Sequence, residues 1–198
     1  MNALLVLPVI LPFTVAAVTL WPGENQGGQH VISILGAFLH LAACAMLFIR
    51  VVQSGMQAMQ VGDWPAPFGI TLAADHLSVV MVMVTAILGF AVTLYSRAEI
   101  DSDLLGAGYH PLLHILLGGV CGAFLTGDLF NLYVWFEVML MASFGLLVLG
   151  RTKEQLDGGV KYVMINLFAT LLFISGIGLL YGMTGTLNLA DRHRAVQE

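Results

Sequence analysis

The chain has 198 residues, of which 59% are hydrophobic and only 10% are charged, whereas a soluble domain carries about a quarter charged residues. So few charges cannot cover a water-facing surface, and this composition excludes a soluble enzyme, a nucleic-acid reader and a disordered regulator. The net charge is −5, and no cluster of basic residues could follow a phosphate backbone. A membrane domain is the class that fits these values.

Six apolar stretches are long enough to cross a bilayer, which takes about 20 residues of helix. We expect an all-α integral membrane protein that forms a single membrane domain over residues 1–198. Pro8 and Pro12 should kink the first helix, and no basic segment or cleavage site marks it as a signal peptide. The expected spans are 3–20, 31–49, 77–95, 109–125, 129–150 and 162–183.

Two longer loops separate the spans. The loop 53–75 contains Pro65 and Pro67, which forbid a continuous helix, so we expect it to lie extended at the membrane interface with Trp64. The loop 96–108 carries most of the charges between the third and fourth spans. Counting basic residues near the spans gives four on one side and three on the other, which favours an outside N-terminus.

Glu137 is the informative residue, because it is a carboxylic acid inside an apolar span. At 1.5 Å per residue it lies about 13 Å from Asp128 and about 21 Å from Arg151 along the helix, near the middle of the bilayer. A charge there costs about 2.5–3.5 kcal/mol on insertion scales. The side chain is either a neutral, hydrogen-bonded packing acid or a site that handles protons or cations.

Three histidines are further candidates. His110 and His114 are four residues apart and share one helix face, while His40 lies halfway along the second span. An i, i+4 histidine pair can bind a metal, but no third ligand is near in sequence, so we expect no metal site. The histidines either lie on a proton or water path or pack at a helix interface. Cys44 and Cys121 lie in apolar stretches and are expected to be buried thiols.

Lys161 stands at the start of the sixth span. It is either an interfacial anchor that extends to water or a cation that tunes an intramembrane carboxylate. Glycines four residues apart, at Gly118/Gly122 and Gly178/Gly182, predict close helix crossings.

Four motifs resemble the D subunit of the Mrp-type multisubunit sodium/proton antiporter, a family related to the antiporter-like membrane subunits of respiratory complex I and of membrane-bound hydrogenases. The most specific is the block 124–143, which contains Phe136-Glu137-Val138-Met139. The others are the loop 62–70 with Ala74-Asp75, the pair Lys161-Tyr162, and Thr184–Asn188. Together they extend over nearly the whole chain.

The resemblance implies that Glu137 is the intramembrane acid for ion transport, that Lys161 belongs to a charged axis near it, and that the N-terminus is outside. It also implies other antiporter subunits as partners, in a bacterial cell membrane. Family members are more than twice this length, with about fourteen helices. We therefore expect the chain to be the N-terminal part of a larger antiporter-like bundle, truncated, split or incomplete.

The leading hypothesis is a proton-translocating subunit, or an N-terminal fragment of one, in a multisubunit antiporter that exchanges protons for a monovalent cation, with Na⁺ favoured. It would be a secondary transporter subunit with no cofactor, and would act as a translocase only within a quinone-reductase-like complex. One alternative is a proton-pumping subunit of a complex I or hydrogenase type redox complex. Another is a structural or assembly fragment without transport. A haem protein that uses His40, His110 or His114 is a further rival, although two histidines on one helix suit haem ligation badly.

Overall fold

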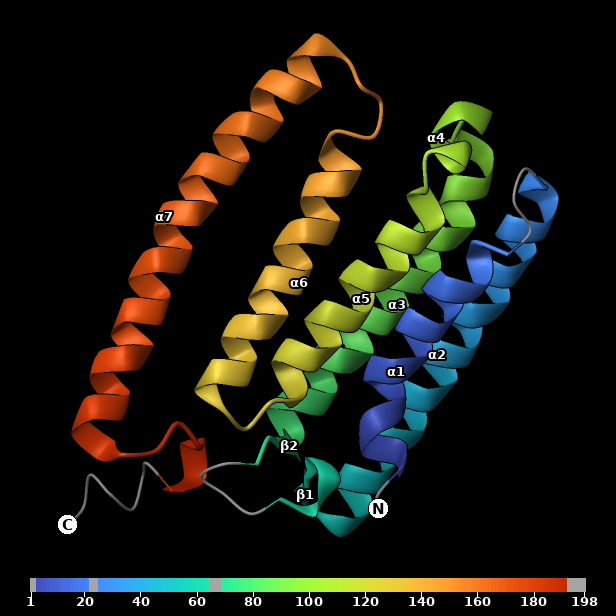
Figure 1. Cartoon of the computed structure of the whole chain (residues 1–198). Helices are drawn as coiled ribbons and strands as arrows, with labels where there is room; N and C mark the ends of the chain where they lie inside the picture. Colours follow the sequence, from blue (N-terminus) through green and yellow to red (C-terminus); the bar gives the residue numbers. More distant parts are fainter. Residues whose placement is uncertain (1–2, 22–24, 65–68, 192–198) are drawn as a thin grey trace.

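Long helices that alternate in direction make up most of the computed structural model, which describes residues 3–21, 25–64 and 69–191. Successive long helices run up and down the bundle, so the start of the first and the end of the last lie at the same end (Figure 1). The long helices within the described residues are α1 (Ala3–Thr19), α2 (Gln26–Ser54), α3 (His76–Glu99), α5 (Tyr109–Leu125), α6 (Leu129–Leu147) and α7 (Lys153–Thr184).

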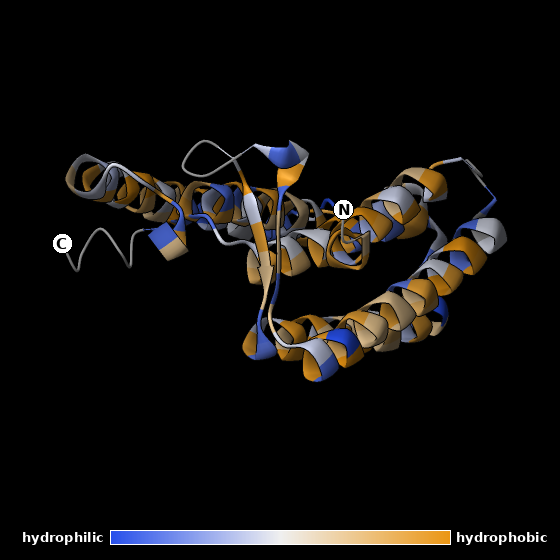
Figure 2. Ribbon diagram, turned by 90° about the horizontal axis from the view of Figure 1, so that it is seen from below, coloured by the Kyte–Doolittle hydropathy of each residue, from blue (hydrophilic) through white to orange (hydrophobic). Residues whose placement is uncertain are grey.

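Four of these helices, α2, α3, α6 and α7, are long and apolar enough to cross a membrane, while α1 and α5 are shorter apolar helices of 17 residues each. The predicted class of helical membrane protein is confirmed, with a count of about six spans. Figure 2 shows apolar residues distributed along all the long helices, as expected of surfaces that face lipid or one another.

Some helices extend beyond the apolar stretches that predict them. Helix α2 begins at Gln26, where the Asn25 side chain accepts a hydrogen bond of 3.1 Å from the Gly28 N–H. Helix α7 begins at Lys153, nine residues before the expected span, behind a capping box formed by Thr152 and Gln155. These first turns are polar but helical, because their caps satisfy the free backbone N–H groups at the helix start. A hydropathy pattern contains no information on such caps.

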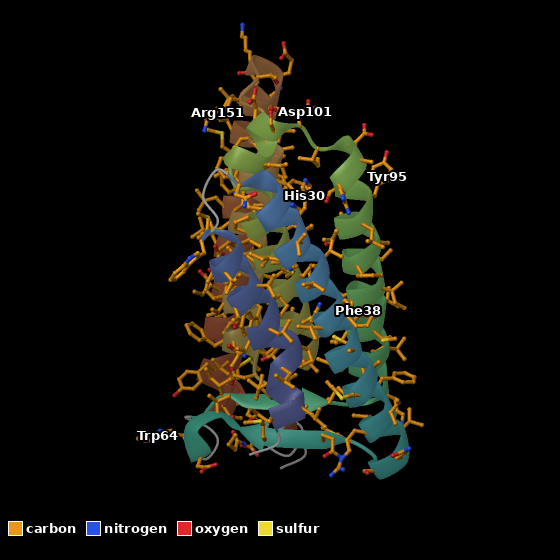
Figure 3. The ribbon with its side chains drawn as sticks, turned by 90° about the vertical axis from the view of Figure 1, so that its right-hand side faces the viewer. His30, Phe38, Trp64, Tyr95, Asp101 and Arg151 are labelled. Atoms are coloured by element: carbon orange, nitrogen blue, oxygen red, sulfur yellow. The ribbon has the colours of Figure 1, made fainter. Side chains whose placement is uncertain are left out.

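The loop 53–75 contains a β-ribbon that the sequence analysis did not predict. Strand β1 (Gln57–Gln60) pairs antiparallel with strand β2 (Thr71–Ala74), and a single 3₁₀ turn, η1 (Val61–Asp63), follows β1. The ribbon lies across one end of the bundle (Figure 2). Trp64 is exposed at that end (Figure 3), while the prolines at 65 and 67 lie outside the described residues.

Two further segments join the ribbon. An isolated bridge pairs Leu72 of β2 with Thr126, and another pairs Asp128 with Asn188. The Gly127 N–H donates to the Thr71 carbonyl at 2.8 Å. The α5–α6 turn and the segment after α7 are therefore fastened to the ribbon, and this fixes where α6 begins.

The core lies between α1, α2, α3 and α5, where most of the fully buried apolar side chains are found. Helices cross closely at small residues: a Cβ atom placed on Gly122 would lie 2.4 Å from the Trp135 indole, and one on Gly118 would lie 2.8 Å from the Phe13 ring. The expectation for Gly118 and Gly122 therefore holds. The expectation for Gly178 and Gly182 is wrong within the described residues, because no atom lies within 4 Å of a Cβ at either position.

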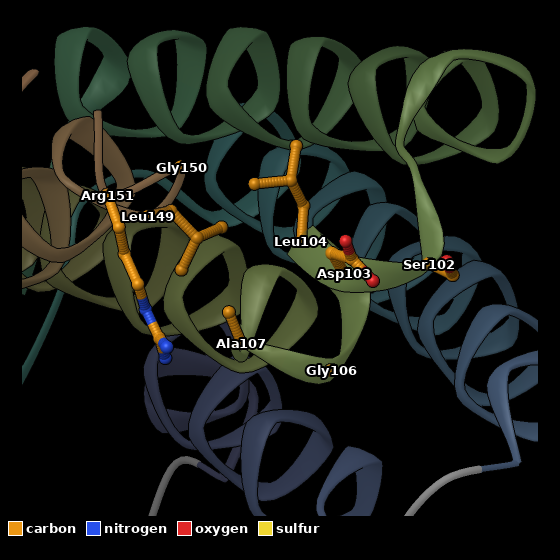
Figure 4. Close-up of a pocket in the computed structure, with 8 residues that line it drawn as sticks. All are labelled: Ser102, Asp103, Leu104, Gly106, Ala107, Leu149, Gly150 and Arg151. Carbon is orange, nitrogen blue, oxygen red and sulfur yellow. The ribbon is translucent and has the colours of Figure 1, made fainter.

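A short helix, α4 (Ser102–Gly106), caps the opposite end of the bundle. It borders a cavity of about 510 Å³ that Arg151 of the α6–α7 connection also lines (Figure 4). Tyr95 and Asp101 lie at this end, opposite Trp64 (Figure 3). Charged residues thus gather where α3, α4 and the α6–α7 connection meet.

Candidate ion-translocation site

Glu137 lies near the middle of α6, on a helix whose start is fixed by Asp128. The Asp128 carboxylate accepts a hydrogen bond of 2.9 Å from the Asn131 N–H and so caps the first turn. Glu137 is half-buried, and its Oε1 atom accepts a hydrogen bond of 3.0 Å from the hydroxyl of Thr170 on α7. The acid therefore faces α7 and has a neutral donor as its partner.

Helix α7 presents a polar stripe towards α6. Tyr162, Asn166 and Thr170 are spaced four residues apart, so they lie on one face of a helix that is otherwise mostly apolar. The Asn166 amide donates to the Tyr162 carbonyl at 2.8 Å. The Tyr162 hydroxyl lies 2.8 Å from the Ser143 hydroxyl of α6.

The Ser143 hydroxyl also lies 3.0 Å from the Leu140 carbonyl of its own helix. The pairing of Glu137 with Thr170 and of Ser143 with Tyr162 sets a regular antiparallel register between α6 and α7.

A cavity of about 210 Å³ lies along this register. It brings Glu137 and the three residues of the polar stripe into one space, together with apolar side chains of both helices. Its lining residues are Glu137, Leu140, Met141, Phe144, Tyr162, Val163, Asn166, Leu167 and Thr170. Glu137 and Tyr162 are the titratable members of this lining.

Lys161 is exposed and lies beside Tyr162 at the α6–α7 end of the stripe. It is nine residues from Thr170, which corresponds to about 13 Å along the helix axis. The hydrogen-bond partner of Glu137 is therefore the Thr170 hydroxyl, and Lys161 is not brought into contact with the acid.

His110 and His114 face α2 rather than the Glu137 cavity. His114 Nε2 lies 2.8 Å from the Ser33 hydroxyl, and His110 Nε2 lies 3.1 Å from Nδ1 of His30. Both rings of α5 are fully buried. The two histidines thus form a second polar seam, between α2 and α5, with His30 and Ser33 of α2.

His40 has a different partner. Its Nε2 atom lies 3.1 Å from the carbonyl oxygen of Pro8 on α1. In a helix that carbonyl would accept from the residue four positions later, but that residue is Pro12, which has no N–H. His40 therefore supplies the donor that Pro12 lacks, and its Nε2 atom also lies 3.5 Å from the Cys121 thiol of α5.

None of these groups is arranged as a metal site. Among the residues that the structure describes, no group of three or more His, Cys, Asp or Glu side chains could hold a metal ion. Cys44 and Cys121 are free and buried, as expected.

The sequence analysis missed Thr170, Asn166, Ser143, His30 and Ser33. The four-residue spacing of Tyr162, Asn166 and Thr170 could have revealed the α7 stripe. No pattern within one helix could have revealed the contacts of His30 and Ser33, because these depend on how α2 sits against α5.

Residues 126–197 match the family model described as the transmembrane domain of the NADH:quinone oxidoreductase/Mrp antiporter family. Among curated relatives, the chain is 44% identical over 191 residues to a protein named as the D subunit of an Na⁺/H⁺ antiporter, from Alkalihalophilus pseudofirmus. It is 41% identical over 201 residues to the D subunit of a probable K⁺/H⁺ antiporter from Rhizobium meliloti. These alignments cover 96% of this chain but only 39% and 36% of the relatives. The chain therefore spans about two fifths of the length of the curated relatives it matches.

Solved structures show the same arrangement of helices. A chain in the Mrp complex from Dietzia sp. superposes with a TM-score of 0.87 and 29% identity, covering 96% of this chain and 36% of that one. A chain in the membrane-bound sulfane sulfur reductase, described as an archaeal respiratory membrane complex, superposes with a TM-score of 0.83 and 27% identity, covering 96% of this chain and 38% of that one.

Proposed function

Because this chain is homologous to the N-terminal two fifths of Na⁺/H⁺ antiporter D subunits, we propose that it forms the corresponding part of a proton-translocating subunit. The subunit belongs to a multisubunit antiporter in a bacterial cell membrane, and the exchanged cation is Na⁺. Glu137 is its proton site. The name of the Rhizobium relative makes K⁺ the alternative cation.

The observation that carries the proposal is the position of Glu137. It is a carboxylic acid in the middle of an apolar helix, it is bonded to a neutral hydroxyl and it borders a cavity between α6 and α7. A carboxyl group in such a setting can exchange a proton with a neighbouring group as the local charge changes. Binding and release of that proton is the elementary step of antiport.

We propose that Lys161 acts on Glu137 through space rather than by direct contact. It lies on the same helix as Thr170, about 13 Å further along the axis. A cation that approaches the carboxylate favours its ionised form, and one that withdraws favours the protonated form. A change in the distance between the Lys161 ammonium and Glu137 would thereby alternate proton release and uptake.

We propose that His110 and His114 are a separate set of proton-handling groups. Both rings are fully buried, and each has one nitrogen bonded to a side chain of α2. Because the contact of His40 with the Pro8 carbonyl explains its position, we do not include it in this path. Flux that persists unchanged in both His110→Gln and His114→Gln would remove the pair from the path.

The test of the main proposal is proton flux by the assembled complex in membrane vesicles. Glu137→Gln keeps the shape of the side chain and its bond to Thr170 but loses the titratable proton, so coupled transport should be lost at normal subunit abundance. Glu137→Asp retracts the acid by one methylene and should keep partial activity. Glu154→Gln, which removes an acid from the first turn of α7, is the matched control and should transport normally.

Full flux from Glu137→Gln at normal abundance would contradict the proposal. It would favour the alternative that this part of the subunit is structural.

A second candidate is a proton-pumping subunit of a redox-driven complex, favoured by the likeness to the sulfane sulfur reductase chain. The two functions separate in one experiment. An antiporter moves protons in response to an imposed cation gradient without any reductant, whereas a redox-driven complex requires electron transfer.

A further inference from the structure

Helix α7 carries its polar side chains in a pattern that simple packing does not require. A helix that faces lipid and one apolar neighbour needs no polar stripe, yet Tyr162, Asn166 and Thr170 are all directed into the cavity that Glu137 borders. The stripe begins at Tyr162, nine residues inside α7 from Lys153, and ends at the Thr170 hydroxyl on Glu137. It therefore extends from the acid towards the α6–α7 end of the helix pair.

We propose that this face of α7, formed by Tyr162, Asn166 and Thr170, is the route by which protons pass between Glu137 and the end of the bundle at the α6–α7 connection. The inference rests on the proposed function, since it takes Glu137 as the proton site. It adds the direction from which the site is reached and assigns roles to three residues of α7.

The cavity has room for a hydrated path. A cavity of about 210 Å³ is larger than a single water molecule needs, so water can enter beside the acid. Water in a buried site needs two to four polar partners. The carboxylate, two hydroxyls and one amide of the lining groups provide them at intervals of one helical turn.

Thr170 acts directly on the acid as a positioning residue. Its hydroxyl donates to Glu137 Oε1 at 3.0 Å, and this bond fixes the direction in which the carboxyl group points within the cavity.

The groups that face Glu137 from its surroundings are few. On α7 the titratable lining residue is Tyr162, and on α6 Tyr133 lies one turn before the acid. From α5, the helix on the other side of α6, His110 and His114 are directed to α2 instead. Among the described residues, the Thr170 hydroxyl is therefore the side chain that is hydrogen-bonded to the acid.

The experiment measures proton flux in vesicles that contain the assembled complex, with subunit abundance checked in the same preparation. Thr170→Val removes the hydroxyl at nearly constant shape and should lower the proton flux several-fold. Thr170→Ser retains the hydroxyl and should restore the flux. Tyr162→Phe and Asn166→Leu interrupt the route and should lose most of the flux.

The matched control is Ser175→Ala. Ser175 is an exposed residue of α7 whose hydroxyl donates to the Leu171 carbonyl at 2.7 Å, and it does not line the cavity. This variant should keep the flux.

A second readout reports on the Thr170 bond itself. The infrared carbonyl band of protonated Glu137, identified by its loss in Glu137→Gln, should shift in Thr170→Val and return in Thr170→Ser. A band that stays unchanged in Thr170→Val would contradict the assignment of Thr170 as the partner of the acid.

The two levels of the proposal fail differently. If Glu137→Gln is inactive while Thr170→Val, Tyr162→Phe and Asn166→Leu all match Ser175→Ala in flux, the route is wrong and the proton site stands. If Glu137→Gln transports normally, the proposed function itself is wrong.

Discussion

The side-chain amide of Asn188 donates a hydrogen bond of 2.7 Å to the hydroxyl of Thr71, joining the segment after α7 to strand β2, 117 residues earlier. The Thr71 hydroxyl in turn donates to Gln60 of β1 at 2.9 Å. Three loops that are far apart in sequence thereby form one hydrogen-bonded unit at the end of the bundle. Thr71 and Leu72, the α5–α6 turn and Asn188 meet there, so this unit holds the starts of α3 and α6 and the end of α7 together.

Replacing Asn188 by Ala should loosen this unit. Asn188 is almost fully buried, and the loss of its amide leaves buried polar groups without partners, which costs about 1–3 kcal/mol. Thermal unfolding in detergent should therefore occur at a lower temperature in Asn188→Ala. Thr71→Ser keeps the accepting oxygen and serves as the control; equal melting of Asn188→Ala and the unchanged protein would show that the bond contributes nothing.

The sequence predicts the helices well and their ends poorly. Long apolar stretches predict α3 and α5, because an uninterrupted run of apolar residues is enough to indicate a helix in lipid. The first two turns of α7 cannot be predicted from apolar residues, because they are stabilised by the capping box of Thr152 and Gln155. The β-ribbon cannot be predicted in this way either. Gln57–Gln60 lacks the alternation of apolar and polar residues that indicates a strand, and its conformation depends on the segments that pair with the ribbon.

The same contrast applies to the candidate site. Glu137 can be found from sequence because a carboxylate in an apolar span is costly. Its partner Thr170 cannot, because the pairing depends on the register between α6 and α7. The expected proximity of Lys161 came from a resemblance, and nine helical residues separate it from Thr170 here.

Alanine should have opposite effects on thermal stability at Gly122 and at Gly182. An alanine methyl at Gly122 would meet the Trp135 ring at 2.4 Å, and such overpacking costs about 1–3 kcal/mol. At Gly182 nothing in the described chain lies within 4 Å, and alanine is the better helix former by about 1 kcal/mol. In melting experiments Gly122→Ala should be destabilised and Gly182→Ala should not; the reverse order would contradict the packing of α5 on α6.

His40 should contribute to stability because Pro12 provides no backbone N–H for the Pro8 carbonyl. His40→Leu leaves the Pro8 carbonyl without its donor, at a cost of about 1–3 kcal/mol. Pro12→Ala restores a backbone N–H to that carbonyl, so the loss caused by His40→Leu should be smaller in the Pro12→Ala background. Melting temperatures of the two single variants and the double variant test this coupling, and strict additivity would disprove it.

Asp75 provides a pH-dependent contribution at the start of α3. Its carboxylate accepts a hydrogen bond of 2.7 Å from the Ser78 N–H, and this bond, more than the neighbouring His76, lowers the pKa of Asp75 below its ordinary 3.8. Because the folded-state pKa lies below the unfolded one, the stabilisation is present above pH 3.8 and is lost as pH falls through the folded value.

Asp75→Ala should accordingly cost about 1 kcal/mol at neutral pH, the usual value of a helix N-cap. The difference from the unchanged protein should shrink at about pH 3. Asp75→Asn keeps the cap without the charge, so its difference from the unchanged protein should be small at neutral pH. A cost of Asp75→Ala that is the same at both pH values would rule out the carboxylate as its source.

The alternation of helices predicts the sidedness of the loops. Gln60 lies at the end with the β-ribbon and Ser102 at the opposite end with α4. With the N-terminus outside, Gln60→Cys should react with an impermeant thiol reagent in whole cells, and Ser102→Cys should react only after permeabilisation. The native Cys44 and Cys121 are buried and should stay silent. Labelling of Ser102→Cys from outside would reverse the orientation.

The contact between His40 and the Pro8 carbonyl also constrains how the nascent protein enters the bilayer. When α1 leaves the translocon, Pro12 has already removed the backbone donor for that carbonyl, and lipid offers no replacement. The matching donor is synthesised 32 residues later, on α2. We therefore expect α1 and α2 to settle in the membrane as a pair, with the first helix retained near the protein-conducting channel until the second arrives.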